Sequence, residues 1–205
     1  MLHVLQSGGA PAGERVLRTM FAARKSVFVD LLKWNVPVVA GTYEIDRFDD
    51  REATYLVLTD HGGEHLGSAR LLRTDRAHIL GSFYPELCAR EIPSGPRIRE
   101  VTRFCLDRRL KAAERRQVRD TLVAALADHA LANGIEAYSA IAQIGWFQQI
   151  LAFGWRCRPL GLPRHSDGAL LAALRIDIDT DTPALLRAAG IAASPKLAGD
   201  LRAAA

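Results

Sequence analysis

The chain carries the stretch R-E-V-T-R-F at residues 99–104, inside a predicted strand from Ile98 to Leu106. In a regular strand Glu100 and Arg103 would point to opposite faces. Charges among apolar neighbours are costly unless they are paired and hydrogen-bonded. A helix is predicted directly afterwards, from about Lys111 to Ala132. The order of elements therefore changes at this stretch, from a β-hairpin to a strand followed by a helix.

The elements on either side of this stretch define the fold class. Upstream, the pattern predicts an amphipathic helix over 16–29, a long ordered loop over 31–43, and a hairpin of strands over 54–59 and 65–72. Downstream it predicts a strand over 135–142, a helix over 145–153, strands near 155–160 and 169–178, a helix over 182–189 and a loosely held tail over 191–205. A meander followed by strands that alternate with helices predicts an α/β domain with a mixed sheet covered by helices.

Length and composition favour one globular domain spanning residues 1–205. The chain is 49% hydrophobic and 24% charged, and no shift in composition marks a boundary. No apolar run approaches the roughly 20 residues of a membrane span, so we expect no span and a cytoplasmic location. The three cysteines are widely spaced and form no C-x-x-C pair, which favours reduced packing residues over disulfides or a zinc site.

Six charged residues stand beside residues that belong in a core. Three are cationic and three anionic, so their formal charges cancel. A neutral cluster of this kind would suit a zwitterionic ligand. The six residues are Arg24, Asp46, Asp49, Arg70, Glu100 and Arg103.

These residues belong to an ordered set of motifs. The set comprises R-x-x-x-F at Arg24 and Phe28, then Trp34, E-x-D-x-F-D at 44–49, Arg70, Phe83, and E-x-T-R-F at 100–104. In this order and spacing it resembles the acyl-homoserine-lactone synthases, the LuxI-type autoinducer synthases, over about the first half of the chain. Leu31 and Arg73 depart from the family pattern, but neither belongs to the charged set.

The resemblance implies a GNAT-like acyltransferase fold, with a mixed, mostly antiparallel sheet covered by helices. It also implies an enzyme that makes an N-acyl-L-homoserine lactone signal for quorum sensing. Such enzymes acylate the amino group of S-adenosylmethionine from an acyl carrier protein or acyl-coenzyme A, and lactonisation then releases methylthioadenosine. S-adenosylmethionine is a substrate here, so no cofactor and no metal is expected.

The resemblance also assigns roles to individual residues. Glu100 is the expected base for the amine, with Asp46 and Arg103 as the other catalytic candidates. Phe28 and Trp34 would offer aromatic faces to the sulfonium cation. The residues expected to bind S-adenosylmethionine are Arg24, Phe28, Trp34, Asp49, Arg70, Phe83 and Phe104.

The acyl group is expected between the strands over 98–106 and 135–142 and the helix after them. The expected lining is Val101, Thr102, Ala140, Ile141, Ala142, Trp146 and Ile150. Family members that prefer 3-oxo chains tend to carry a threonine on the second strand. Ala140 and Ala142 offer no hydroxyl, so an unsubstituted, branched or aryl acyl group is expected.

Basic residues crowd the start of the helix after the central strand, where the helix macrodipole disfavours cations. An anionic partner is expected to compensate, either a phosphopantetheine or pyrophosphate group or an acidic carrier protein. The glycine loop that binds coenzyme A in GNAT proteins is absent, which mildly favours a carrier protein; a solvated face is the simpler alternative. The basic residues are Arg108, Arg109, Lys111, Arg115, Arg116 and Arg119.

Two other functions remain open from the sequence. A GNAT-type N-acyltransferase acting on another amine would not need the set formed by Arg24, Trp34 and Asp46. A basic module that binds nucleic acid or a carrier protein would leave Glu100 unexplained. The net charge of +4 and pI near 9.2 are lower than a dedicated nucleic-acid binder usually shows, so no nucleic-acid partner is expected.

Overall fold

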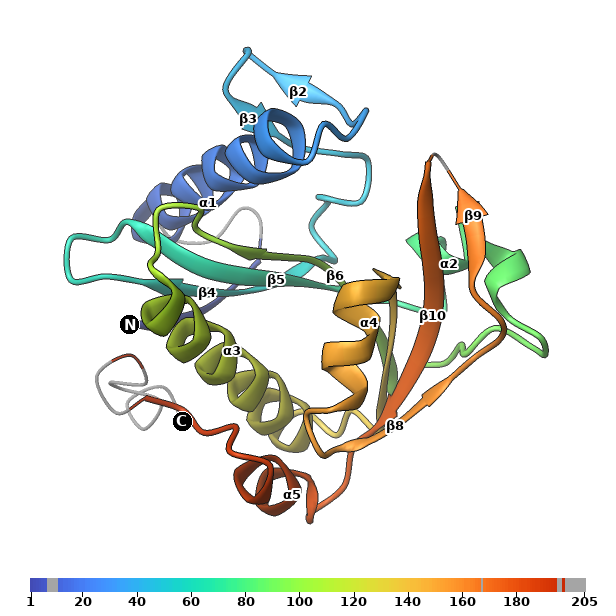
Figure 1. The fold of residues 1–205 in the computed structure, drawn as a ribbon. Helices are drawn as coiled ribbons and strands as arrows, with labels where there is room; N and C mark the ends of the chain where they lie inside the picture. The colour runs from blue at the N-terminus through green and yellow to red at the C-terminus, as the bar shows by residue number, and fades with distance from the viewer. Residues whose placement is uncertain (7–10, 167, 195–196, 198–205) are drawn as a thin grey trace. The chain divides into compact units, whose positions relative to one another are not determined.

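The computed structural model describes residues 1–6, 11–166, 168–194 and 197, and its ribbon is shown in Figure 1. Its strands are β1 (Leu2–Gln6), β2 (Val38–Val39), β3 (Tyr43–Glu44), β4 (Thr54–Thr59), β5 (His65–Arg73), β6 (Ile98–Leu106), β7 (Ala137–Gln143), β8 (Arg156–Pro159), β9 (Arg164–Ser166) and β10 (Ala169–Asp177). Its helices are α1 (Pro11–Arg24), the π-helical η1 (Lys25–Leu31), α2 (Ile79–Phe83), the 3-10 turn η2 (Pro85–Leu87), α3 (Ala112–Ala132), α4 (Ile144–Leu151) and α5 (Thr182–Ala188).

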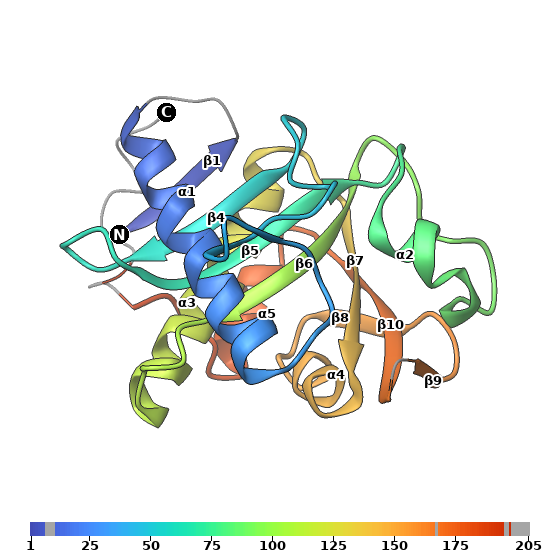
Figure 2. The ribbon, with the colours of Figure 1, turned by 90° about the horizontal axis from the view of Figure 1, so that it is seen from above.

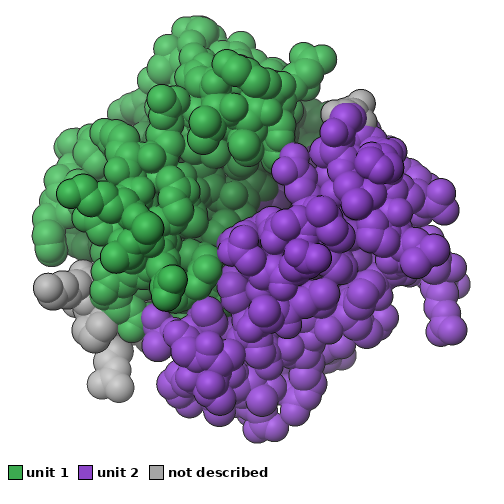
Figure 3. All heavy atoms as spheres, in the orientation of Figure 1, with its two compact units in different colours: residues 1–70, 103–125, 193–205 green, residues 71–102, 126–192 purple. Residues whose placement is uncertain are grey.

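The chain divides into two compact units, which Figure 3 colours separately. Unit 1 comprises residues 1–70, 103–125 and 193–205, and unit 2 comprises residues 71–102 and 126–192. Strand β6 contributes its first five residues to unit 2 and the remainder to unit 1. The stretch over 99–104 is therefore shared by both units.

In unit 1 the strands follow the order β1, β4, β5, β6, and β1 pairs antiparallel with β4. Helices α1 and α3 cover opposite faces of these strands (Figures 1 and 2). On one face, the ring of Phe21 meets Tyr55 edge-on at 5.8 Å between centroids. On the other, a Cβ added at Gly67 would lie 2.7 Å from Cγ1 of Val118. The glycine therefore permits α3 to pack closely on β5.

The segment after α1 differs from the prediction. The helix expected over 16–29 begins earlier, at Pro11, and continues beyond Arg24 as the π-helical turn η1. The expected loop contains the small sheet β2–β3, in which Val38 pairs with Glu44. Strand β1 was not predicted, because it is only five residues long and its partner strand lies about fifty residues away.

In unit 2 the strands follow the order β6, β7, β10, β8, and β9 also pairs with β10. Strands β6 and β7 run parallel, with Glu100 opposite Ser139. Strand β10 pairs antiparallel with β7, β8 and β9. The parallel pair follows from the long crossover through α3, which returns the chain in the same direction.

Two sets of helices cover unit 2. Helix α4 packs on β7 and β10 through its buried residues Phe147 and Ile150. The short elements α2 and η2 contribute Leu80 and Leu87 to a core cluster with Ala173. Neither short element was predicted, because five and three residues are too few to show a helical period.

The structure confirms the predicted fold class, a mixed and mostly antiparallel sheet flanked by helices. The predicted hairpin, the central strand, the long helix and the strand–helix units after it are present within a few residues. At the C-terminus, Ile191 is buried and the backbone N–H of Ser194 donates to Thr121 Oγ1. The rest of the predicted loose tail, 195–196 and 198–205, lies outside the described residues. No described helix combines the length and hydrophobicity needed to cross a membrane.

Candidate active site

A buried arginine ends helix α1. Arg24 is 1% exposed, and its Nε donates to Oε2 of Glu44 at 2.5 Å. Its terminal nitrogens donate to both oxygens of Asp49 at 2.8 and 2.9 Å. Glu44 ends β3, and Asp49 lies in the turn that leads to β4. The planar guanidinium matches a carboxylate in this two-bond arrangement, which fixes both partners.

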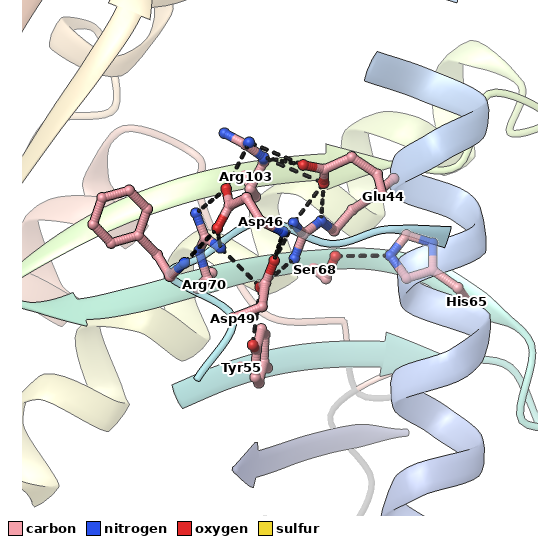
Figure 4. Close-up of polar contacts among 10 residues, drawn as sticks. Glu44, Asp46, Asp49, Tyr55, His65, Ser68, Arg70 and Arg103 are labelled. Carbon is pink, nitrogen blue, oxygen red and sulfur yellow. Dashed lines mark hydrogen bonds and ion pairs between the residues drawn. The ribbon is translucent and has the colours of Figure 1, made fainter. Parts of the chain in front are cut away.

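A second arginine, Arg70 on β5, binds the other aspartate of the same turn. Its nitrogens lie 2.7 and 3.0 Å from the two oxygens of Asp46, and Nη1 lies 2.8 Å from Oδ1 of Asp49. The turn holds its own carboxylates in place, since the N–H of Asp46 donates to Asp49 and the N–H of Phe48 donates to Asp46. Figure 4 shows these contacts between the turn and β5.

A third arginine, Arg103 on β6, completes the cluster. Its Nε and Nη2 donate to Oε1 of Glu44 at 3.1 and 2.9 Å, and Nη2 donates to Oδ2 of Asp46 at 2.8 Å. Its backbone has a φ of +50°, in the left-handed region that non-glycine residues rarely adopt. Such a conformation costs about 1–2 kcal/mol. The ion pairs with Glu44 and Asp46 offset this cost and hold the side chain in place.

The guanidinium of Arg103 also lies against two aromatic rings. Phe28 and Trp34 are stacked, with ring centroids 4.6 Å apart and planes 12° apart. The Cζ atom of Arg103 is 5.7 Å from the centroid of Phe28 and 5.8 Å from that of Trp34, within cation–π range. The two predicted aromatic faces are therefore together, and they already contact a cation of the protein.

The neutral cluster contains a carboxylate that was not among the predicted residues, Glu44. Arg24, Arg70 and Arg103 are balanced by Asp46, Asp49 and Glu44. Glu44 stands in the E-x-D-x-F-D motif, two residues before Asp46. Its position in that motif was the sequence signal that could have identified it as a member of the cluster. We name this set of six residues the arginine–carboxylate cluster.

Tyr55 is a further partner that sequence reasoning missed. This buried side chain of β4 donates from its hydroxyl to Oδ1 of Asp49 at 2.9 Å. Burial, together with the negative charge of Asp49, raises the pKa of Tyr55 well above its usual value. The phenol therefore stays protonated and acts as a donor. No sequence pattern distinguished this tyrosine from a core residue.

The cluster keeps its aspartates ionised. Burial alone would raise the pKa of Asp49, but hydrogen bonds and charges from Arg24 and Arg70 outweigh it and hold that pKa well below its usual range. The same balance lowers the pKa of Asp46, with Arg70 and then Arg103 as the opposing cations. Carboxylates held this strongly in the charged form are poor proton acceptors. Asp46 is thus suited to holding arginines rather than to acting as a base.

Glu100 has a different environment in unit 2. It is fully buried, and its two oxygens accept backbone N–H bonds from Ile79 and Leu80 at 2.8 Å each. These amides open the short helix α2, so the position of the carboxylate depends on that helix. Thr74 holds the start of β6, the strand that carries Glu100, because its hydroxyl donates to the carbonyl of Ile98.

The other two predicted aromatic contacts lie on different elements. Phe83 ends α2, is 51% exposed, and meets Tyr84 edge-on. Phe104 follows Arg103 on β6 and is half-buried.

The predicted acyl lining is divided between the two faces of the unit 2 strands. Val101 and Ala140 are register partners and share a face, and Ala142 lies on the same face of β7. Helix α4 carries Trp146 and the buried Ile150, and it packs on β7. Ile141 does not join them, because alternation along β7 turns it to the opposite face, against the cluster of Leu80, Leu87 and Ala173. Thr102 directly precedes the left-handed residue of β6.

The predicted basic residues lie on the loop before α3 and on its first turns. Arg108, Arg109, Lys111 and Arg116 are exposed. Arg109 pairs with Asp107 at 2.6 Å, and Arg119 pairs with Asp120 at 2.6 Å. Arg115 donates to the backbone carbonyl of Asp107 at 2.9 Å. Part of the positive charge is therefore already neutralised within the chain, and the exposed residues keep the surface basic.

The fold is shared with solved structures of low sequence identity. A putative N-acetyltransferase from Lactobacillus plantarum superposes with a TM-score of 0.53 at 16% identity, covering 87% of this chain and 99% of that one. Among the described residues no group of three or more His, Cys, Asp or Glu side chains is placed to hold a metal ion. The fold and the site together define a mixed α/β protein of GNAT-like fold with a buried arginine–carboxylate cluster.

Residues 12–185 match the autoinducer synthase family. The chain is 34% identical over 191 residues to an acyl-homoserine-lactone synthase of Rhizobium etli, covering 92% of this chain and 89% of that protein. It is 30% identical over 185 residues to the isovaleryl-homoserine lactone synthase of Bradyrhizobium diazoefficiens, covering 89% and 82%. The structure of BjaI, a coenzyme A-dependent synthase with S-adenosylmethionine and isopentyl-coenzyme A, superposes with a TM-score of 0.84 at 28% identity, covering 96% and 91%. The chain belongs to the autoinducer synthase family and is an acyl-homoserine-lactone synthase.

Proposed function

We propose that this enzyme acylates the amino group of S-adenosylmethionine from a coenzyme A thioester of a short acyl group, and then closes the lactone. The BjaI structure is described with S-adenosylmethionine and isopentyl-coenzyme A, and the synthase of Bradyrhizobium diazoefficiens is named for an isovaleryl product. In the sequence, the absence of the glycine loop mildly favours an acyl carrier protein over coenzyme A as the donor. The structures of BjaI and MesI are both described as coenzyme A-dependent synthases and favour coenzyme A, so the carrier protein becomes the alternative donor.

The contact of Arg103 with both the arginine–carboxylate cluster and the stacked pair Phe28–Trp34 carries the binding proposal. A sulfonium cation is attracted to aromatic faces, and a carboxylate pairs with a guanidinium. We assign the sulfonium end of the substrate to the aromatic pair and its carboxylate to Arg103. S-adenosylmethionine carries a sulfonium, an ammonium and a carboxylate, so it brings one net positive charge to the neutral cluster, and the aromatic pair supplies the faces that attract this cation.

Glu100 is the proposed base, since the arginines of the cluster make its aspartates poor proton acceptors. The substrate ammonium gives one proton to the Glu100 carboxylate, and the freed nitrogen attacks the thioester carbonyl. The C–S bond to the carrier then breaks, the nitrogen loses its second proton as the amide forms, and the leaving thiolate takes up a proton. In the second step the substrate carboxylate attacks its own γ-carbon, the bond from that carbon to the sulfonium breaks, and methylthioadenosine leaves. This second step depends on positioning and requires no nucleophile from the protein.

The two ends of the donor are assigned to different residues. The exposed residues Arg108, Arg109, Lys111 and Arg116 would meet its phosphates, because anions favour the start of a helix and cationic side chains. The acyl group would meet the face that carries Val101, Ala140 and Ala142. The small side chains of that face suit a short unsubstituted, branched or aryl group.

The test is methylthioadenosine release by the purified protein from S-adenosylmethionine and a panel of thioesters. The panel pairs each straight, branched and aryl acyl group on coenzyme A with the same group on acyl carrier protein. We expect release with short acyl-coenzyme A and an acyl-homoserine lactone by mass spectrometry. Glu100→Gln should lower the rate by at least about a hundredfold, whereas the exposed control Glu91→Gln should not.

Each other outcome has a defined meaning. Release only with the carrier protein would overturn the donor assignment and leave the reaction intact. Acylation of another amine, without methylthioadenosine, would move the enzyme to a general N-acyltransferase. Equal rates for Glu100→Gln and the native enzyme would remove Glu100 as the base.

A further inference from the structure

One buried hydroxyl has no hydrogen-bond partner within the described part of the chain. Ser139, on strand β7, is 0% exposed, and its Oγ contacts no donor or acceptor. A buried polar atom without a partner is destabilising, whereas alanine would fill nearly the same space at no such cost. The sequence around it, A-Y-S-A-I-A over 137–142, shows that alanine is accepted at three neighbouring positions. Packing therefore does not explain a serine at this position.

The position of Ser139 indicates what the hydroxyl is for. Its register partner on β6 is Glu100, and its register partner on β10 is Arg175. Register partners share a face of the sheet and lie on adjacent strands about 5 Å apart. The hydroxyl thus stands in one row between a carboxylate and a guanidinium. Arg175 donates its Nε to Asp177 at 2.6 Å, so its guanidinium is directed along its own strand.

A hydroxyl is the group that can serve both neighbours, because it has one donor and two acceptor sites. We propose, on the basis of the function proposed above, that Ser139 is a positioning residue for Glu100. Its hydroxyl donates a hydrogen bond to the Glu100 carboxylate, directly or through one water, while that carboxylate accepts the proton of the substrate amine. The proton moves from nitrogen to a carboxylate oxygen, and the serine keeps its own.

This hydrogen bond has two consequences for the reaction. It holds the carboxylate from the side of β7, while the amides of Ile79 and Leu80 hold it from the side of α2. It also favours the ionised form, because a donor to a carboxylate stabilises the negative charge. Glu100 would then remain an available base at a lower pH than it would without Ser139.

Other charged groups lie on the unit 2 elements around this position, and substitution of Ser139 leaves all of them in place. His78 precedes α2, and its Nδ1 lies 2.7 Å from the carbonyl oxygen of Arg76. The charged or titratable residues to be held constant are Arg73, Asp75, His78, Arg99, Arg175 and Asp177. A difference in pH profile between the native enzyme and a Ser139 variant therefore reports on the hydroxyl itself.

The test compares native enzyme with Ser139→Ala and Ser139→Thr, using whichever thioester the native enzyme accepts. kcat/KM for S-adenosylmethionine is measured from pH 5.5 to 9, and thermal unfolding is followed in parallel. The substrate amine is the same in every case, so its own titration cancels in the comparison. We expect Ser139→Ala to lose about tenfold at pH 6, the effect of one hydrogen bond to a charged group, and less than about threefold on the alkaline plateau.

The second variant and the unfolding temperature separate this role from a structural one. Ser139→Thr keeps the hydroxyl and should keep the native pH profile. Ser139→Ala should lower the unfolding temperature by no more than a few degrees, because it removes one hydrogen bond and leaves the packing of the strand unchanged. In a Glu100→Gln background, adding Ser139→Ala should change the remaining rate less than about twofold.

Three results would overturn the inference. The first is superimposable pH profiles of active native enzyme and Ser139→Ala, which would leave the proposed function intact. The second is an equal loss at every pH together with an unfolding temperature lowered by more than a few degrees, which would make the role structural. The third is an absence of methylthioadenosine release by native enzyme with every thioester, which would reject the proposed function as well.

Discussion

Replacing Glu44 by glutamine tests whether the arginine–carboxylate cluster is held by charge balance. The substitution preserves size and removes one negative charge from a site that is fully buried. Arg24 loses its 2.5 Å partner, and Arg103 loses the carboxylate that accepts from both its Nε and Nη2. The cluster changes from three cations and three anions to three cations and two anions.

The magnitude follows from the burial of these groups. Removing one partner of a buried ion pair costs about 3–5 kcal/mol, because the remaining charge is left uncompensated. For a chain of this length each kcal/mol lowers the unfolding temperature by about 2–4 °C, so a decrease of roughly 6–20 °C is expected. Activity should fall as well, since Glu44 holds the left-handed Arg103 in place.

Thermal and urea unfolding monitored by circular dichroism give the measurement, with the exposed carboxylate variant Glu91→Gln as the matched control. The control should change stability by less than about 0.5 kcal/mol. In the double variant Glu44→Gln with Arg103→Gln, charge is balanced again, and the loss should be smaller than the sum of the single losses. A Glu44→Gln protein as stable as the control would refute charge balance as the basis of the cluster.

Three further predictions concern other sites. Burial lowers the pKa of His65 to about 4, whereas the pKa of a histidine in the unfolded chain is near 6.5. The free energy of unfolding should therefore be highest above pH 6.5 and should fall by about 3 kcal/mol between pH 6.5 and pH 4. The urea midpoint should fall less over this range in His65→Asn. Gly67→Ala should destabilise the protein by about 1–3 kcal/mol, because the new Cβ would lie 2.7 Å from Val118. Adding Val118→Ala should restore part of the lost unfolding temperature. An unchanged unfolding temperature in Gly67→Ala would mean that α3 shifts freely. Trp34→Leu should raise the KM for S-adenosylmethionine about tenfold with a smaller change in kcat, and an unchanged KM would remove the indole from the substrate site.

Much of the fold followed from local patterns. The strand over 54–59, the central strand and the long helix after it were predictable, because each is long enough to show its period. The short elements β2, β3, α2 and η2 were not predictable, since they are stabilised by tertiary contacts rather than by propensity.

The site shows the same division. The motif spacing alone identified the three arginines, the two aspartates and the aromatic pair, and these residues do lie together in unit 1. It did not show that Glu44 supplies the third negative charge, nor that Tyr55 donates to Asp49. Those assignments depend on which side chains approach within hydrogen-bond distance, and residues as far apart as Glu44 and Arg103 meet only when the chain folds.

The sequence by itself determined the family, the chemistry-bearing residue types and their order, because these are properties of spacing along the chain. Only the tertiary structure decided which charges pair, which face of β7 each residue occupies, and that Ser139 stands beside Glu100. The physical reason is that register and pairing are fixed by contacts between distant segments, where a shift of one residue would exchange the two faces of a strand.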